Sequence, residues 1–547
     1  MALETSVLVV GGGPVGLTLA IDLARRGIDC TLVERRETTT EHPKATLLGA
    51  RSMELFRRWG LDAAIYDKAL PPEHNYFIIF ATRLAKQELY RFTSPSINQV
   101  RNRDPEAAKR FRELAWSPYG KTQIGQQNLE PVLVDEALRQ APTLTFMRGW
   151  RMDGFEQDED GVTASIVADR DSSQRQVRAR YMVACDGGTS RVRKALNIPM
   201  NGRGAMRANT SFYFRAPDFL KVHGLGVANL YFVFADDSFG VFTAIDGKEL
   251  WNYQYYFLDP AKETRDLDPA LVLARAVGKA FDFDLLDVTH WHHHQSIAAK
   301  WRVGNIFLAG DTAHLFAPTG GVGMNTGIGD ACDLAWKLAG TLHGWGGPRL
   351  LNAYEAERKP IAIRNSLISA TNSDKIDLIM AETPPDIDRE GPEGDALRAE
   401  LAAKIKWLAR QFNSAGTHLG YRYADSPICV PDGSQEPPDD TAVVVPSTWP
   451  GSRAPHLWLA DGRSSLDLFG DGFTLLVLGG DVAEADSFAD SAQTVGLPLK
   501  VVAIDDPAMI GAYKMPYVLV RPDGHVAWRA DKLPDDADTV VSKARGA

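Results

Sequence analysis

Two glycine-rich segments, far apart in the chain, constrain its fold more than any other feature. Residues 6–10 form an apolar run that leads into Gly11, Gly13 and Gly16, and residues 305–311 form a similar run with further glycines at 320–323. A short apolar run that ends in glycine before a helix-forming segment is typical of a buried parallel strand. The helix after it presents backbone N–H groups to an anion. The chain is therefore predicted to contain an α/β domain with a ligand at its strand ends.

The first segment has the detailed spacing of a nucleotide-binding turn. Gly11 and Gly13 permit a tight turn and a close approach of the backbone to a ligand, while Gly16 lets the helix lie near the strand. A second strand, residues 30–33, ends in Glu34, where such a fold presents a carboxylate to ribose hydroxyls. One such unit indicates a dinucleotide. Two in this order indicate a flavin held at both ends.

Length and composition agree with a large enzyme. With 547 residues, two to four domains are expected. The formal net charge of −10 argues against nucleic acid or an anionic membrane as the main partner. The chain has 4 cysteines and no CxxC pair, which predicts a reducing cytoplasm and gives no cysteine-rich metal site. The N-terminal apolar run is too short for a signal peptide or a membrane span, so a cytoplasmic location is expected.

Two further regions have a distinct character. Residues 210–258 contain aromatic, β-prone runs separated by turns, which predicts an antiparallel sheet that could wall an apolar cavity for a flat ligand. From about residue 446 the pattern is strand, helix, strand and then a hairpin with a Pro-Asp-Gly turn. This order matches a thioredoxin-like fold. Because the last cysteine is Cys429, thiol redox chemistry is excluded there.

Over nearly its whole length the chain resembles the class A FAD-dependent aromatic monooxygenases, typified by para-hydroxybenzoate hydroxylase and phenol hydroxylase. Four sequence features carry the resemblance: the first glycine turn with Glu34, a DG motif at Asp186-Gly187 with Ser190 and Arg193, a GD motif at Gly310-Asp311 followed by His314 and Pro318, and a Gln-x-x-x-Glu helix at Gln126 and Glu130. The phenol hydroxylase and polyketide hydroxylase branches of the family also carry a C-terminal thioredoxin-like extension.

The resemblance implies the architecture. The expected fold class is α/β, with a Rossmann-like FAD-binding domain, an inserted antiparallel-sheet substrate domain and a C-terminal thioredoxin-like domain. The expected FAD-binding domain comprises residues 1–70, 112–195 and 280–375, and the substrate domain comprises 71–111 and 196–279. Residues 376–445 are expected to form a helical connection, and 446–547 the thioredoxin-like domain without redox cysteines.

The resemblance also implies the site. Asp311 would hold the flavin ribityl chain, and the helix after residue 320 would face the flavin pyrimidine edge with its N-terminus. Pro318 would line the place where oxygen adds to the flavin C4a carbon, with Gly320 leaving room for it. The full set of expected cofactor-binding residues is Gly11, Gly13, Pro14, Val15, Gly16, Glu34, Arg35, Lys44, Gln126, Asp186, Arg193, Gly310, Asp311, Pro318, Gly321, Gly323, Met324 and Asn325.

The implied activity is hydroxylation of a phenolic or related aromatic substrate by a flavin C4a-hydroperoxide, with NADPH or NADH and O2. Two alternatives stay open: Baeyer–Villiger, epoxidising or dehydrogenating chemistry on a polycyclic substrate, and a flavin-binding protein without turnover. The expected partners are a small aromatic substrate and O2, in a homodimer or larger homo-oligomer, with no nucleic acid and no membrane.

Some positions leave more than one interpretation. Lys44 stands where the family usually has an arginine beside the flavin, and a plain surface lysine is equally compatible. Tyr213 and Tyr253, like Tyr231 and Tyr255, are candidate phenol-directing groups that also fit structural roles. The three histidines at 292–294 would point to alternate faces of a strand and therefore cannot converge on one metal ion, so no metal site is expected.

Overall fold

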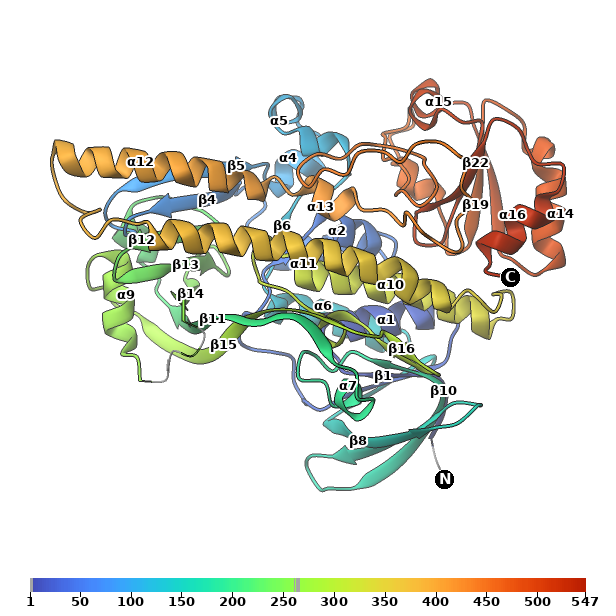
Figure 1. The fold of residues 1–547 in the computed structure, drawn as a ribbon, viewed down its shortest axis with the longest axis horizontal. Coiled ribbons are helices and arrows are strands. Elements are labelled where there is room, and N and C mark those ends of the chain that lie inside the picture. The colour runs from blue at the N-terminus through green and yellow to red at the C-terminus, as the bar shows by residue number, and fades with distance from the viewer. Residues whose placement is uncertain (1–2, 260, 262–265) are drawn as a thin grey trace.

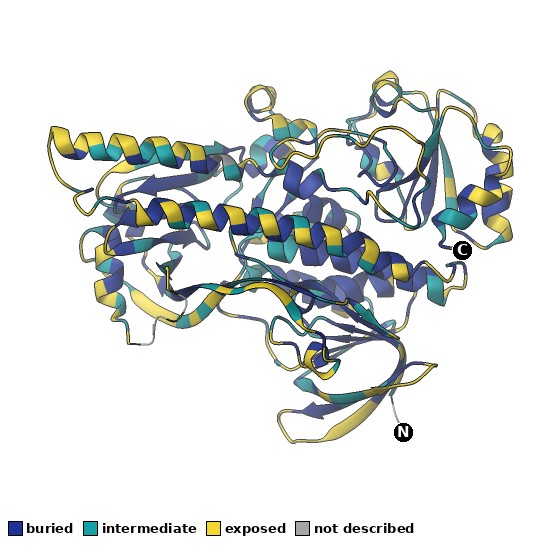
Figure 2. Ribbon diagram, viewed as in Figure 1, coloured by how far each residue is buried: buried dark blue, intermediate teal, exposed yellow. Residues whose placement is uncertain are grey.

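The computed structural model describes residues 3–259, 261 and 266–547. Figure 1 shows three regions along the long axis: a mixed sheet with its helices in the middle, a second sheet at one end, and the C-terminal domain at the other. Figure 2 shows buried residues along the strands and helices of the middle region and within the C-terminal domain.

The first sheet has a Rossmann-like parallel core. Its strand order is β16-β17-β10-β1-β2-β7, and β1 pairs in parallel with both β2 and β10. Helix α1 (Pro14–Arg25) packs against α6 (Gln126–Arg139) and α10 (Val322–Leu342). Apolar residues of these helices and of the central strands form one buried cluster, which accounts for the apolar sequence of those strands. An antiparallel ribbon, β8 and β9, extends from β10. The strand bounds are β1 Leu3–Val10, β2 Cys30–Glu34, β7 Leu144–Arg148, β8 Trp150–Gln157, β9 Val162–Ala168, β10 Gln174–Ala184, β16 Arg302–Val303 and β17 Ile306–Leu308.

The second sheet is antiparallel except for the parallel pair β12 and β4, and its order is β18-β15-β11-β14-β13-β12-β4-β5. The predicted aromatic sheet is therefore present. Strand β15 lies within residues 280–375, a range expected for the FAD-binding domain, yet it pairs with β11 of the second sheet along most of its length. The strand bounds are β4 Tyr76–Ala81, β5 Glu88–Ser94, β11 Met200–Arg215, β12 Leu230–Ala235, β13 Ser238–Ala244, β14 Leu250–Phe257, β15 Asp284–Ala298 and β18 His314–Leu315.

Two long helices join the regions. Helix α11 (Asn352–Ala381) is 30 residues long and runs from the side of the C-terminal domain to the second sheet (Figure 1). Helix α12 (Pro392–Leu408) then packs over β5, and both helices bury apolar residues against one face of the second sheet. Helix α9 (Pro269–Val277) covers the other face. The other α-helices before the C-terminal domain are α2 Ala50–Arg57, α3 Asp62–Lys68, α4 Ile97–Arg101, α5 Pro105–Arg110, α7 Arg191–Ala195, α8 Phe219–His223 and α13 Ala415–Leu419.

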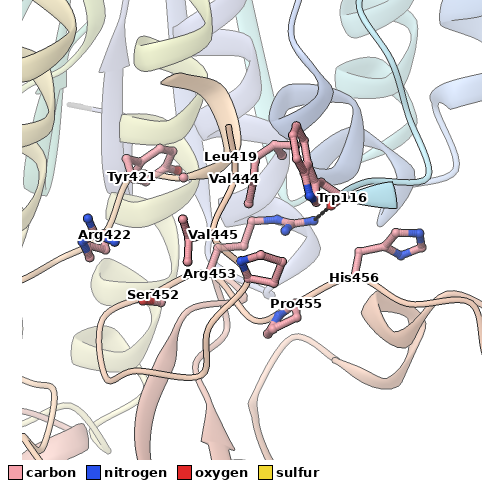
Figure 3. A pocket seen from close by; sticks show the side chains of 12 residues that line it. Trp116, Leu419, Tyr421, Arg422, Val444, Val445, Ser452, Arg453, Pro455 and His456 are labelled. Carbon is pink, nitrogen blue, oxygen red and sulfur yellow. Dashed lines mark hydrogen bonds between the residues drawn. The ribbon is translucent and has the colours of Figure 1, made fainter. Parts of the chain in front are cut away.

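The C-terminal domain has the predicted thioredoxin-like order. Its sheet runs β20-β19-β21-β22, with β19 parallel to β20 and antiparallel to β21. A buried ion pair joins the C-terminal domain to helix α2 of the middle region: Arg453 Nη2 lies 2.5 Å from Glu54 Oε1. Arg453 also borders a small cavity of about 20 Å³ beside Trp116 (Figure 3). The element bounds are β19 Phe473–Leu478, α14 Asp486–Thr494, β20 Leu499–Ile504, α15 Pro507–Tyr513, β21 Tyr517–Val520, β22 Val526–Ala530 and α16 Ala537–Ala544.

None of the helices in the described part of the chain is both long and apolar enough to cross a lipid bilayer.

Candidate active site

One cavity of about 1190 Å³ begins at the carboxyl ends of the first-sheet strands and continues to the second sheet. Most of the expected site residues line it. These are Gly11, Gly13, Pro14, Val15, Glu34, Arg35, Lys44, Gln126, Asp186, Asp311, Pro318, Gly320, Gly321, Gly323 and Met324. Four more of the expected cofactor-binding residues do not line it: Gly16, Arg193, Gly310 and Asn325. The fold therefore brings motifs that are far apart in the sequence together around one cavity.

The turn before α1 combines close packing with open space. Gly11 has φ +108°, and a Cβ there would lie 2.3 Å from the carbonyl oxygen of Cys185. A Cβ on Gly16 would lie 1.9 Å from the carbonyl oxygen of Gly11, so this glycine is required for the helix to approach the strand. A Cβ on Gly13 would meet nothing within 4 Å. Gly13 caps α1 without a side-chain hydrogen bond, so the first-turn N–H groups face the cavity.

Glu34 is fixed at the end of β2. Its Oε2 accepts the Gly12 N–H at 2.6 Å, and its Oε1 accepts the Arg36 N–H at 2.9 Å. Arg36 Nε also donates to Oε1, at 3.2 Å. A carboxylate has about four acceptor positions, so Glu34 keeps one for a ligand hydroxyl. Arg35 is exposed beside it on the cavity wall.

The DG and GD motifs meet at the end of the first sheet. Thr312 donates its hydroxyl to Asp186 Oδ1 at 3.2 Å, while Asp186 Oδ2 accepts the Arg191 N–H at the start of α7. Arg193 donates to the carbonyl oxygens of Thr312 and Gly188 at 3.0 and 2.9 Å. Arg193 therefore braces two loops behind the cavity.

Asp311 lines the cavity after β17. Although its side chain is exposed there, the surrounding protein desolvates it and raises the pKa of its carboxyl, while His314 and Lys44 act in the opposite direction. Lys44 thus lies close enough to interact with Asp311. Gly310 has φ +61°, and a Cβ there would lie 2.9 Å from Val15 Cγ2, so this glycine lets the GD loop pack on α1.

The N-terminus of α10 faces the same cavity. Its cap residue Gly321 has φ +63° and offers no side-chain cap. Asn325 holds this turn to the segment before α2, because its Oδ1 accepts the Gly49 N–H at 2.7 Å and its Nδ2 donates to the carbonyl oxygens of Leu47 and Gly321 at 3.0 and 2.7 Å. The positive end of the α10 helix dipole is therefore directed at the cavity.

Gln126 is oriented by a buried carboxylate. Its Nε2 donates to Glu130 Oε1 at 2.7 Å, and Glu130 Oε2 accepts the Thr40 N–H at 2.9 Å. This ties α6 to the loop before residue 44. The side chain of Gln126 is thereby fixed at the cavity wall.

The second sheet supplies the far wall through one of its two faces. Phe232, Val241, Gln254 and Tyr256 line the cavity. Tyr253, which neighbours Gln254 and Tyr256 on β14, points the other way, stacks on Phe242 with centroids 4.1 Å apart and is fully buried. The structure therefore does not bring Tyr253 to the cavity.

Tyr213 lies near the cavity but does not line it. It is half-buried, and its ring packs edge-on at 6.0 Å from the ring of His42, which does line the cavity. Tyr231 is buried in the cluster behind the sheet, and Tyr255 packs against that cluster.

Two cavity residues, His42 and Lys121, were not singled out by the sequence. His42 Nδ1 lies 2.8 Å from Asp287 Oδ2, and its Nε2 lies 3.1 Å from the hydroxyls of Ser211 and Thr289. Burial lowers the pKa of His42, and Asp287 opposes this shift. Neither His42 nor Lys121 belongs to a recognisable sequence motif, so the local sequence does not indicate its role.

The histidines at 292–294 lie on β15 as expected. His292 and His294 share one face with ring centroids 6.2 Å apart, whereas His293 is buried on the other and contacts Arg207 Nη2 at 3.1 Å. Within the described ranges, no group of three or more His, Cys, Asp or Glu residues is arranged to hold a metal ion.

These features fit FAD. Two uncapped helix N-termini, at α1 and α10, face one elongated cavity, and the backbone at Gly13 opens onto free space. A diphosphate suits the first terminus, and the electron-rich edge of a flavin ring suits the second. Glu34 and Asp311 stand at the corresponding strand ends as acceptors for ribose and ribityl hydroxyls.

Comparison with known proteins agrees with this geometry. A family model described as FAD binding domain matches residues 4–366, and one described as aromatic-ring hydroxylase, C-terminal, matches residues 447–546. The chain is 31% identical to the FAD-dependent monooxygenase apdD of Emericella nidulans, over 99% of this chain and 90% of the relative. It is 32% identical to a tetracenomycin B2 monooxygenase-dioxygenase of Streptomyces olivaceus, over 98% and 97%.

Solved structures show the same fold over the whole chain. RebC with bound 7-carboxy-K252c matches with a TM-score of 0.90 and 36% identity, covering 100% of both chains. The flavin-dependent monooxygenase PieE, in complex with FAD and substrate, matches with a TM-score of 0.88 and 30% identity, covering 99% of this chain and 98% of that one. With its motifs gathered around one cavity, the chain belongs to the class A FAD-dependent monooxygenases.

Proposed function

We propose that this protein is an aromatic hydroxylase that uses NADPH or NADH and O2 to place one oxygen atom on an aromatic ring. The observation that carries the proposal is the continuity of the cavity, from the helix N-termini that suit FAD to the aromatic face of the second sheet. The names of relatives that act on tetracenomycin and aklavinone favour a polycyclic aromatic substrate over a simple phenol.

The residues of this chain have distinct roles in the proposal. When bound, FAD takes electrons from the nicotinamide cofactor and passes oxygen to the substrate. Gly11, Gly13 and Glu34 hold the nucleotide half, while Asp311 and the N-terminus of α10 hold the flavin half. Pro318 and Gly320 border the space for oxygen. Phe232 and Tyr256 offer flat apolar surface to the substrate ring and exclude water from the reacting atoms.

His42 is the proposed acceptor of the substrate hydroxyl proton. Its lowered pKa keeps the imidazole neutral at pH 7, so that it can accept a proton from the cavity. The side chain of its partner Asp287 is 49% exposed, which gives the proton a route to solvent. Ser211 and Thr289 contact His42 Nε2 and extend this route to the cavity wall.

The test is product analysis with purified FAD-loaded protein. Phenols, hydroxybenzoates and polycyclic aromatics are incubated with NADPH or NADH under ¹⁸O2. A product with one labelled hydroxyl on the ring supports the proposal. A labelled ester or epoxide, or an unlabelled oxidised product, favours the alternative oxidations. Nicotinamide oxidation that responds to no aromatic compound favours a flavin protein without turnover.

A further inference from the structure

Lys121 is a half-buried cation in the cavity wall, and no anionic partner pairs with it in the part of the chain that the structure describes. It precedes β6 (Thr122–Gln123), and its ammonium lies 5.6 Å from the ring centroid of Tyr76 and 6.0 Å from that of Phe92. It donates to the carbonyl oxygen of Phe412. Among the residues that the structure describes, no carboxylate lies within ion-pair distance of it, and Glu113 acts on it only from farther away.

A lone ammonium in such surroundings is costly. Burial lowers the pKa of Lys121 to about 8, which means that the protein disfavours its charged form unless an anion is near. An ammonium has three donors, and the Phe412 carbonyl takes one. Two donors remain, and Lys121 lines the cavity together with Tyr76 and Phe412.

Two amides beside Lys121 also lack partners. Both polar atoms of Gln123 and both of Gln411 are buried without a hydrogen bond inside the described part of the chain, and both residues line the cavity. Gln411 precedes Phe412 in the chain, and Gln123 lies two residues after Lys121. Buried polar groups are nearly always paired, so the two amide nitrogens without acceptors, beside an ammonium without an anion, indicate a missing acceptor.

His418 does not add a second charge at this position. His418 lies close enough to feel the charge of Lys121, and burial lowers the pKa of His418 to about 3, so its imidazole is neutral. Tyr76 and Phe92 belong to β4 and β5 of the second sheet. The position is thus on the sheet side of the cavity, where the proposed function places the substrate, and not at the glycine turn and Glu34 that suit the nucleotide.

We propose that Lys121, with the amides of Gln123 and Gln411, forms a subsite for an anionic oxygen of the aromatic substrate, either a carboxylate or an ionised phenol or enol. The assignment of this ligand to the substrate rests on the proposed function. The ammonium supplies the charge, the amide N–H groups supply further donors, and the adjacent aromatic face of the second sheet receives the ring. The substrate class is therefore a flat aromatic acid.

The test compares an acid with its neutral amide. Binding of 2-naphthoate and 2-naphthamide to oxidised, FAD-loaded protein is followed by calorimetry and by the change in the flavin spectrum, without nicotinamide or turnover. The wild-type protein is expected to bind the acid about tenfold or more tightly than the amide. Lys121→Met should abolish this preference, Lys121→Arg should keep most of it, and Gln411→Leu should reduce it.

Lys221→Met is the matched control, because it removes the same charge from a side chain that is 84% exposed. It should leave the preference unchanged. Equal affinity for acid and amide in the wild-type protein, failure of the acid to bind, or a preference that survives in Lys121→Met would each overturn the subsite. The binding measurement needs no reaction, so the two proposals can fail separately. A preference for the anion without hydroxylation would refute only the proposed function. Hydroxylation without a preference for the anion would refute only the subsite.

Discussion

At the scale of single residues, the glycines of the first turn are required for different reasons. Gly16 is required by the fold, since a side chain there would overlap the backbone of Gly11. Gly13 has φ −75°, which any residue adopts, and open space at its Cβ. The reason for glycine at 13 therefore lies in the ligand and not in the polypeptide.

This difference predicts opposite outcomes for one substitution at two sites. Gly13→Val should change the free energy of unfolding of the FAD-free protein by about 1 kcal/mol or less, yet the protein should purify without FAD. Gly16→Val should cost about 3 kcal/mol of stability even without FAD. Calorimetry of the apoproteins and the flavin-to-protein absorbance ratio measure both effects. Full flavin content in Gly13→Val would contradict the placement of the diphosphate.

The proposed role of His42 predicts that kcat depends on pH through the protonation of its imidazole. Its pKa is lowered from the ordinary value of 6.5, so kcat should fall as the pH drops through a value below 6.5, where the imidazole becomes protonated. Asp287→Asn removes an influence that raises this pKa, so the acid limb should move to still lower pH. His42→Gln should lower kcat by about 100-fold and remove the limb. A profile of kcat against pH with an unchanged limb in His42→Gln would exclude this role.

Residues with a local backbone requirement were predictable, and residues that meet only in the fold were not. The glycine turns and Asp311 follow from strand-turn-helix patterns that a short window contains. His42 and Asp287 are 245 positions apart, and Lys121 reaches Phe412 over 291. On β14, Tyr253 shares a face with Trp251 and Tyr255, whereas Tyr256 shares the face of Asn252 and Gln254. This alternation separates Tyr253 from Tyr256, but it does not show which face borders the cavity until β14 is placed in the sheet.

At the scale of elements, α10 connects the two domains at the flavin end of the cavity. The expected glycine-rich start of this helix is confirmed at Gly321, but its attachment through Asn325 depends on a segment near residue 49 that no local pattern indicates. The same limit applies to β15. Its residues 284–292 are mostly exposed or half-buried and carry several charges and histidines, so they give no strong strand signal and the strand is defined by its pairing with β11.

Asn325→Ala tests the attachment of α10. The change removes the side-chain bonds to Gly49, Ser52, Leu47 and Gly321, which should cost about 2–4 kcal/mol of stability and weaken FAD binding, because the helix N-terminus loses its position. Thermal unfolding and FAD titration of the apoprotein provide the measurements. Asn201→Ala, at an exposed position on β11, is the control. Unchanged FAD affinity in Asn325→Ala would show that α10 is held by packing alone.

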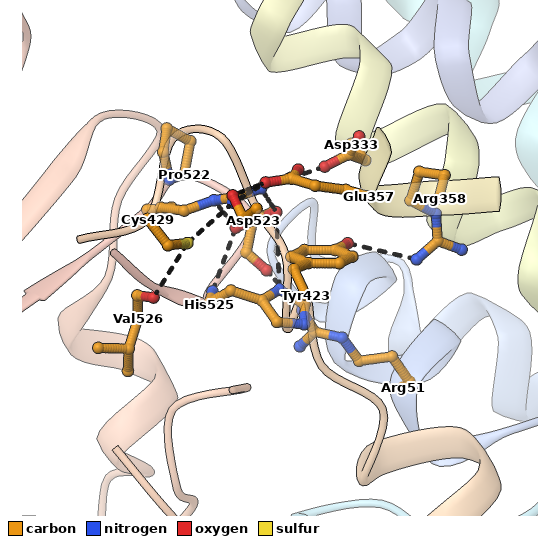
Figure 4. Close-up of polar contacts among 12 residues, drawn as sticks. Arg51, Asp333, Glu357, Arg358, Tyr423, Cys429, Pro522, Asp523, His525 and Val526 are labelled. Atoms are coloured by element: carbon orange, nitrogen blue, oxygen red, sulfur yellow. Dashed lines mark hydrogen bonds and ion pairs between the residues drawn. The ribbon is translucent and has the colours of Figure 1, made fainter. Parts of the chain in front are cut away.

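At the scale of the whole molecule, a buried ion network joins the C-terminal domain to the helices of the FAD-binding domain (Figure 4). Arg521, next to the β21–β22 turn, contacts Glu357 on α11 at 2.6 Å, Asp333 on α10 at 3.3 Å and Asp523 at 2.7 Å. Lys337 bonds Asp333 and Glu357 from the other side. Burial opposes the ionisation of Glu357, but Arg521 and Lys337 hold the pKa of its carboxyl low. Because α10 also faces the flavin end of the cavity, the C-terminal domain braces the cofactor site from behind.

Arg521→Met tests this bracing. The substitution leaves three buried carboxylates with Lys337 as their remaining cation, which should cost about 3–5 kcal/mol, much more than a surface ion pair contributes. The loss should appear in both domains: a lower unfolding temperature and weaker FAD binding, even though Arg521 lies outside the cavity. Arg463→Met removes an exposed pair with Asp461 in the same domain and should change neither quantity measurably. If Arg521→Met lowers stability while FAD affinity stays at the wild-type value, the C-terminal domain stabilises the chain without bracing α10, and the two ends of that helix are energetically independent.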